Sequence, residues 1–93
     1  MSEDWKNSET EELFKAVLKL KTKGECAKFF RDLCTLSELK AMGERLAVAK
    51  MADKKIPYRE IARQTGASTA TVTRVAHWLH HGEGGYKLVL KRF

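Results

Sequence analysis

Residues 58–75 combine apolar side chains at helical spacing with short polar and basic side chains. Val72, Val75 and Leu79 recur at intervals of three and four, so they form one buried stripe of a helix. The remaining side chains at the start of this helix are short or basic and would face outward: Ser68, Thr69, Ala70, Thr71, Thr73 and Arg74. Threonine and alanine methyls can pack on thymine methyls, and threonine hydroxyls can bond to bases, phosphates or waters. The pattern therefore favours a surface that reads the major groove.

A sharp turn and a supporting helix must hold this surface in place. Gly66 falls at the turn, where φ > 0 costs glycine little, and Ser68 can cap the following helix. Ile61 and Ala62 would face inward from the preceding helix. We therefore predict a helix-turn-helix over residues 57–81. Plain structural packing is the alternative, but the outer face has no bulky apolar residue and little of the Glu and Lys typical of a solvated helix.

Positive charge is concentrated outside the first 14 residues. The net charge is +6; residues 1–14 hold five acidic side chains against Lys6, and the remainder holds 17 basic and 7 acidic side chains. A basic body favours a polyanion through neutralised phosphates and released counterions, although many small proteins have a basic surface. Four side chains are expected to contact phosphates: Lys54, Lys55, Arg59 and Arg63. No Asn, Gln or Arg is placed early in the helix for a bidentate base contact, so specificity should depend on water and DNA shape.

Other classes of protein have little support in the sequence. No apolar run approaches a membrane-spanning length, and the acidic start does not resemble a signal peptide. Cys26 and Cys34 lie in amphipathic patterns, which favours reduced core cysteines in a cytoplasmic protein over a disulfide.

We also expect neither catalysis nor a metal. His77, His80 and His81 could gather a metal, but no fourth ligand is near, so surface or interface roles are favoured. Without a paired nucleophile and base or a glycine-rich phosphate loop, we expect no enzyme activity and no cofactor.

Almost every segment reads as helix, which predicts one all-α domain of about six helices over residues 1–93. Residues 8–54 would supply core and dimerisation helices. The first would run from Asn7 or Ser8 to about Lys21 and be broken by Gly24, and the third would end near Lys54. Its inward residues would be Leu39, Met42, Leu46 and Ala49. Residues 86–93 would form a last helix, with a strand over residues 87–91 as the alternative.

The apolar faces at residues 13–20 and 86–93 need cover that one chain does not supply. A homodimer would cover them and would present two recognition helices to half-sites one helical turn apart. The expected partners are therefore a second copy of the chain and a palindromic double-stranded operator, with no membrane.

Three stretches resemble the Trp-repressor-like family, specifically its YerC/YecD-type branch. They are residues 25–35 (ECAKFFRDLCT), 44–51 (ERLAVAKM) and 66–74 (GASTATVTR), the last matching the family's turn and recognition helix nearly residue for residue. The resemblance covers about residues 10–93. It implies an intertwined all-α dimer with two DNA-binding helix-turn-helix regions.

The resemblance also implies a possible effector pocket. In the tryptophan-sensing repressor, two arginines, a threonine, a glycine and a serine surround the corepressor. Arg45, Arg74 and Thr35 fall at the arginine and threonine positions, whereas Val75 replaces the glycine and Trp78 the serine. A branched side chain and an indole would fill the space of the ligand, so we predict that L-tryptophan is not the effector. No other effector is assigned.

Arg45 and Arg74 have competing interpretations. Arg74 could bind a DNA phosphate or a ligand carboxylate, because the guanidinium fork suits both. Alternatively, both arginines form ion pairs with acids such as Glu44 or Glu60. The leading hypothesis for the whole chain is a sequence-specific DNA-binding regulator that represses by occlusion. The alternative is a protein-interaction module of the same fold with incidental DNA binding.

Overall fold

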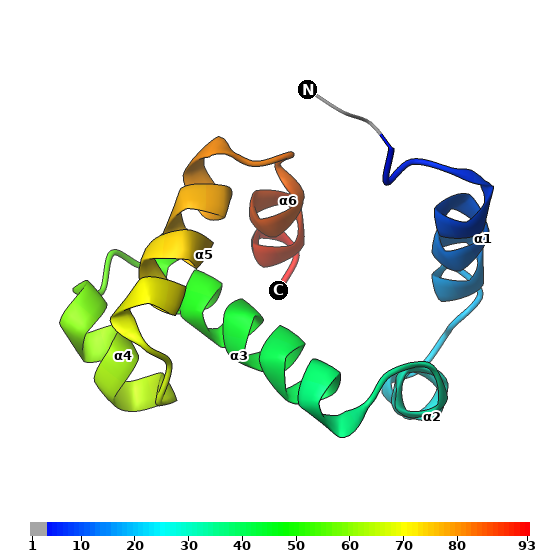
Figure 1. The fold of residues 1–93 in the computed structure, drawn as a ribbon, viewed down its shortest axis with the longest axis horizontal. Helices are drawn as coiled ribbons and strands as arrows, with labels where there is room; N and C mark the ends of the chain where they lie inside the picture. Colours follow the sequence, from blue (N-terminus) through cyan, green and yellow to red (C-terminus); the bar gives the residue numbers. More distant parts are fainter. Residues whose placement is uncertain (1–3) are drawn as a thin grey trace. The chain divides into compact units, whose positions relative to one another are not determined.

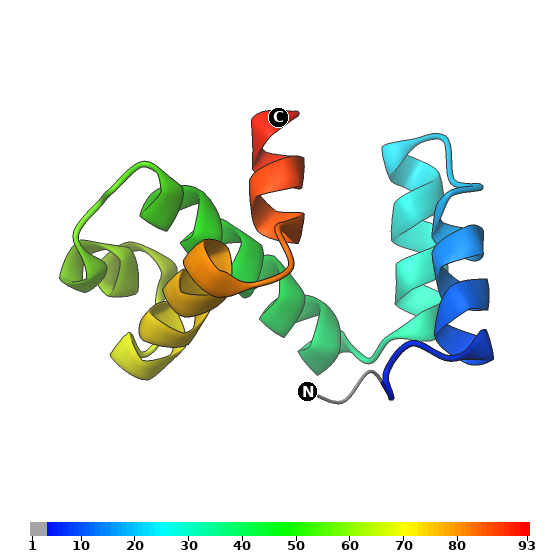
Figure 2. The ribbon, with the colours of Figure 1, turned by 90° about the horizontal axis from the view of Figure 1, so that it is seen from above.

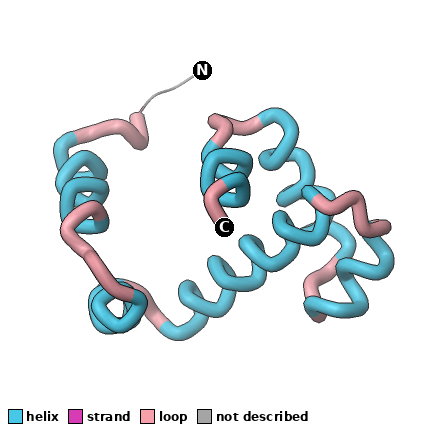
Figure 3. The backbone as a smooth tube through the Cα atoms, turned by 180° about the vertical axis from the view of Figure 1, so that it is seen from behind, coloured by secondary structure: helices cyan, strands magenta, loops and turns pink. Residues whose placement is uncertain are grey.

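The computed structural model describes residues 4–93, and these residues form six α-helices and no strand (Figures 1 and 3). The helices are α1 (Ser8–Val17), α2 (Lys23–Leu33), α3 (Leu36–Asp53), α4 (Tyr58–Thr65), α5 (Thr69–His81) and α6 (Gly85–Lys91). The predicted all-α class is confirmed. The chain divides into two compact units between Leu36 and Ser37, and the single domain over residues 1–93 stays a prediction.

In the first unit, α1 begins with a reciprocal cap. The Thr10 N–H donates to Asn7 Oδ1 over 3.0 Å, and the Asn7 N–H donates to Thr10 Oγ1 over 2.9 Å. The predicted end near residue 21 is wrong, because α1 stops at Val17. There the N–H groups of residues 19 and 20 bond three residues back, to Ala16 O and Val17 O, which tightens and ends the last turn.

The second helix begins before Gly24, the residue that was expected to separate the first helix from the second. Thr22 caps α2 by accepting the Glu25 N–H over 3.0 Å, and Gly24 lies inside its first turn. The prediction that Gly24 breaks a helix is therefore wrong, since the capping threonine decides the start. Cys26 and Cys34 carry free thiols, but both are only half-buried, so they are not the core cysteines that were expected.

The buried core lies in the second unit. In this unit α5 packs against α4 and α6, and Figure 2 shows the course of these helices. The core residues come from α3, α4, the α4–α5 turn and α5: Val48, Ala49, Ala52, Ile61, Ala67, Val72, Val75, Ala76 and Leu79. The predicted stripe of α5 and the inward position of Ile61 are confirmed. On α3 the expected inward face is only partly covered, since Leu39 and Leu46 are half-buried and Met42 is exposed.

The connection between α4 and α5 holds the helix-turn-helix in place. Gly66 has the left-handed φ of 78° that ends α4, and its N–H donates to Ala62 O over 2.9 Å. A Cβ at Gly66 would meet no heavy atom within 4 Å, so the demand is on backbone conformation alone. Ser68 then caps α5, with its Oγ accepting the Thr71 N–H over 3.1 Å. These features confirm the predicted turn and cap.

The last helix covers the end of the core. Tyr86 and Leu90 of α6 pack against the buried cluster, and Lys50 Nζ lies 4.4 Å from the centre of the Phe93 ring. The helical prediction for this segment is confirmed, and the strand alternative for residues 87–91 is wrong.

Candidate nucleic-acid interface

The start of α5 presents the predicted polar face to solvent. Ser68, Thr69, Ala70, Thr73 and Arg74 are exposed, and Thr71 is half-buried. The buried residues of the same helix face the opposite way, into the core. The face is therefore supported by a packed helix rather than by a mobile loop.

Hydrogen bonds within this face decide what each hydroxyl can offer. Thr73 Oγ1 donates to the Thr69 carbonyl over 2.9 Å, so its hydrogen is engaged while its methyl and lone pairs remain available. Ser68 Oγ donates to Thr71 Oγ1 over 3.0 Å, which engages both side chains in the cap. Thr69 Oγ1 makes no hydrogen bond to any part of residues 4–93. Thr69 and Thr71 therefore each keep a hydroxyl hydrogen for a base, phosphate or water, and Thr69 is the more exposed of the two.

The four predicted phosphate-contacting side chains are all exposed: Lys54, Lys55, Arg59 and Arg63. The Arg63 guanidinium is already paired with Glu60. Its Nε donates to Glu60 Oε1 over 2.9 Å, and its Nη2 donates to Glu60 Oε2. Hydrogen bonds from Arg63 first, and from Gln64 Nε2 over 2.6 Å, lower the pKa of Glu60 to about 2. The same pair raises the pKa of Arg63. A phosphate would have to compete with Glu60 for this guanidinium.

Replacing Glu60 should therefore strengthen DNA binding. Glu60→Gln removes a negative charge from α4 and frees the Arg63 guanidinium for a phosphate. We therefore expect about a fivefold gain in DNA affinity. Because the folded-state pKa of Glu60 lies below its usual 4.5, its contact stabilises α4 above about pH 4.5. That contribution is lost as the pH falls towards 2. Fluorescence anisotropy against duplex DNA measures the affinity, and Glu83→Gln is the control. Equal changes in the two variants would contradict the interpretation.

Four of the five predicted effector-pocket residues meet at one opening. Arg45, Arg74, Val75 and Trp78 line a pocket of about 290 Å³ together with Tyr86. Val75 is 2% exposed and Trp78 is 52% exposed. Thr35 belongs to the first unit of the chain. Within residues 4–93 the structure shows no ion pair for either arginine, and Glu60 bonds to Arg63 instead.

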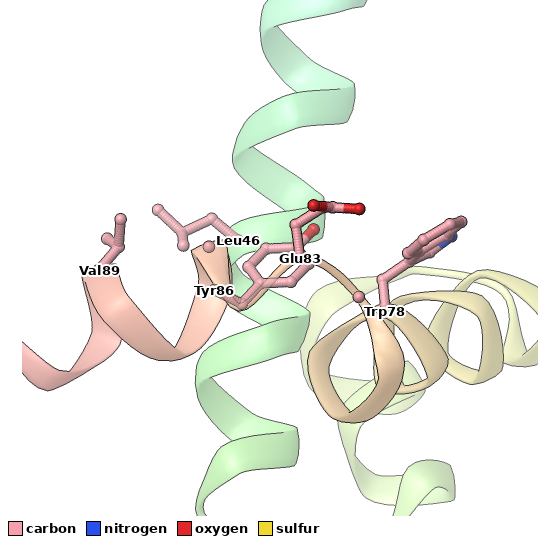
Figure 4. A pocket seen from close by; sticks show the side chains of 7 residues that line it. Leu46, Trp78, Glu83, Tyr86 and Val89 are labelled. Carbon is pink, nitrogen blue, oxygen red and sulfur yellow. The ribbon is translucent and has the colours of Figure 1, made fainter. Parts of the chain in front are cut away.

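A larger apolar pocket of about 550 Å³ adjoins the same tryptophan (Figure 4). Leu46 of α3 and Tyr86 of α6 lie near one another, with Val89 further along α6 and Trp78 on α5. Glu83 is the one charged residue of its lining. The pocket therefore exposes mostly carbon surface in the single chain.

The family comparison agrees with this geometry. The Trp repressor protein model matches residues 8–93, nearly the whole chain. The chain belongs to the Trp repressor family. That family consists of helix-turn-helix DNA-binding regulators rather than enzymes.

Several relatives share this family fold over most of their length. The uncharacterised protein YerC of Bacillus subtilis (strain 168) is 41% identical over 87 residues, which cover 94% of this chain and 84% of that protein. The crystal structure of a TrpR-like protein from Eubacterium eligens ATCC 27750 superposes with a TM-score of 0.93 at 42% identity, covering 98% of this chain and 94% of that one. A crystal structure from Staphylococcus aureus superposes with a TM-score of 0.92 at 41% identity. The match covers 97% of this chain and 90% of that one.

Within this Trp repressor fold, one pocket residue was missed from the sequence. Tyr86 was assigned only to the apolar stripe of the last helix, yet it lines both pockets beside Trp78. The spacing of Tyr86 in the sequence did not indicate this role. Its position beside Trp78 depends on how α6 packs against α5.

The histidines lie together near the end of α5. The His77 and His81 ring centres are 5.2 Å apart, and those of His80 and His81 are 6.4 Å apart. Among residues 4–93, no group of three or more His, Cys, Asp and Glu side chains is arranged to hold a metal ion. In the same range, no helix is both long enough and apolar enough to cross a bilayer.

Proposed function

We propose that the protein is a homodimeric, sequence-specific binder of double-stranded DNA that represses transcription by occluding its operator. The exposed polar face at the start of α5 carries this proposal, because it lies on a helix fixed by a buried core. Exposed basic side chains follow α3 at residues 54 and 55 and lie on α4 at residue 59, and we expect them to contact phosphates. DNA as the partner and two free thiols favour the cytoplasm as its location.

The reading chemistry favours modest direct contacts. Thr69 offers a free hydroxyl, while Ala70 and Thr73 offer methyl groups. With no bidentate side chain at the start of α5, base discrimination would depend on thymine methyls, bridging waters and DNA deformability. We expect Arg74 to contribute a phosphate contact from the same face.

Exposed apolar side chains support the homodimer. Leu18 is 83% exposed, Leu33 is 52% and Phe93 is 74%, and the pocket beside Trp78 adds further carbon surface. The lining of that pocket is a contiguous apolar surface, and surfaces of this kind mark association sites. A second copy would supply matching faces under two-fold symmetry, which would also fit a palindromic operator. Sedimentation at micromolar concentration should give twice the 10.6 kDa chain mass, and a stable monomer would exclude the dimer.

We further propose that L-tryptophan is not the corepressor. Val75 is buried in the core, and the indole of Trp78 lines the pocket that contains Arg45 and Arg74. A free indole would have to displace these groups. Isothermal titration with L-tryptophan should show no stoichiometric binding, and operator affinity should be the same with and without it. Tight one-to-one binding per chain would overturn the proposal.

Selection of bound genomic fragments by the purified protein tests the function as a whole. The proposal expects one enriched palindromic sequence and an affinity that falls steeply with salt. Weak binding without sequence preference would instead favour the protein-interaction module. Repeating the selection with candidate effectors would show whether any small molecule is sensed.

A further inference from the structure

A basic pocket lies where the α3–α4 turn meets the last turn of α5 and the start of α6. It has a volume of about 490 Å³. Lys55, Tyr58, His80 and Lys87 contribute its nitrogen and hydroxyl groups, and Asp53 contributes its one carboxylate. Four separate parts of the second unit thus converge on one opening.

The charges at this pocket are available to a ligand. Within the described residues none of Asp53, Lys55 and Lys87 forms a salt bridge, and all three are exposed. Lys55 has a left-handed φ of 64° in a turn closed by its own N–H to Ala52 O, over 2.9 Å. That turn carries Lys55 to the pocket wall rather than along the axis of α3.

The pocket lies on the same side of α5 as part of the exposed polar face at its start. His80 follows Thr69 and Thr73 by about three and two helical turns, so the three side chains lie along the same side of α5. Tyr58 immediately precedes Arg59, one of the expected phosphate contacts. A duplex lying along this side of α5 would bring its backbone past both the threonines and the pocket.

We propose that this pocket binds a phosphate group of the DNA backbone, and that protonation of His80 strengthens that contact. The inference rests on the proposed DNA-binding function and adds to it a site and a pH response. A phosphodiester favours the imidazolium form by direct attraction, so complex formation takes up protons where histidine changes charge. DNA affinity therefore rises as the pH falls through the neutral range.

The charged and titratable groups that line the pocket with His80 come from separate parts of the second unit. They are Asp53 at the end of α3, Lys55 in the α3–α4 connection, Tyr58 at the start of α4 and Lys87 on α6. On α5 itself, the ring of His81 lies 6.4 Å from that of His80.

Matched variants test the site. Anisotropy titrations with the selected duplex, at about pH 6 and about pH 8, should show wild-type affinity about tenfold higher at the lower pH. His80→Gln should remove most of this difference, and the adjacent control His81→Gln should retain it. Equal pH responses in the two variants would overturn the role of His80.

Salt dependence tests the phosphate contact separately. Lys87→Gln should reduce the slope of log affinity against log salt by about one per subunit. Lys91→Gln removes the same charge from the same helix but does not line the pocket, so its slope should match wild type. Identical slopes for the two variants would overturn the site. Failure of the wild-type protein to bind any duplex would refute the proposed function itself.

The source of the phosphate is distinguished by competition. Inorganic phosphate should weaken DNA binding more than potassium chloride at equal ionic strength, because it competes with the DNA backbone for the pocket, and Lys87→Gln should lose this difference. Equal weakening by the two salts would overturn the DNA-backbone assignment, and direct binding of phosphate in that case would assign the pocket to a free anion.

Discussion

Thr69→Glu combined with Thr73→Glu is expected to lower affinity for the matched operator by at least about a hundredfold. The two positions lie one turn apart on the exposed face of α5, so both carboxylates would face the duplex. Like charges brought together at an interface cost several kcal/mol, and about 1.4 kcal/mol corresponds to a factor of ten. Neither side chain is buried, so the fold should survive. Anisotropy titration and thermal unfolding measure the two properties.

A charge-matched control distinguishes a local effect on the exposed face of α5 from a general effect of net charge. Lys15→Gln with Lys19→Gln also lowers the net charge by two, but changes residues outside the helix-turn-helix. This control should lose only a small part of the affinity. A double glutamate variant that binds as well as the control would show that another surface reads DNA.

The second large effect is expected from Ile61→Ala, which should lower the free energy of unfolding by about 2–5 kcal/mol. Ile61 is 0% exposed and is the fully buried contribution of α4 to the core under α5. Its removal leaves a cavity beneath the reading helix. Urea unfolding followed by circular dichroism measures the loss.

Arg59→Ala on the same helix is the control for this prediction. Its side chain is exposed, so its unfolding free energy should stay within about 0.5 kcal/mol of wild type, while DNA affinity falls. An Ile61→Ala variant as stable as Arg59→Ala would mean that α4 does not depend on this core.

The helix-turn-helix could be predicted because its signals are local. Gly66 at the turn, Ser68 at the cap and the apolar spacing of α5 each act within a few residues, and the structure agrees with all three. The error at Gly24 has the same origin. A glycine was taken as the boundary, while the stronger local signal, the capping oxygen of Thr22, placed Gly24 inside α2.

The pockets could not be predicted in full because they depend on distant segments. Four pocket residues followed from the family resemblance, but Tyr86 reaches Trp78 only through the course of α6. The pocket at Lys55 and Lys87 likewise joins residues more than thirty positions apart. The pairing of Arg63 with Glu60 was missed although their spacing on α4 carried the signal, because residues three apart on a helix are neighbours.

The hydrogen bonds inside the reading face have a consequence for how a set of operators would evolve. The Thr73 and Ser68 hydroxyl hydrogens are already engaged. If the protein binds operators as proposed, no single base contact should dominate recognition. A point mutation in an operator would then lower occupancy by a small step rather than abolish it. Promoters under such a regulator could diverge gradually, each acquiring its own level of repression, without a compensating change in the protein.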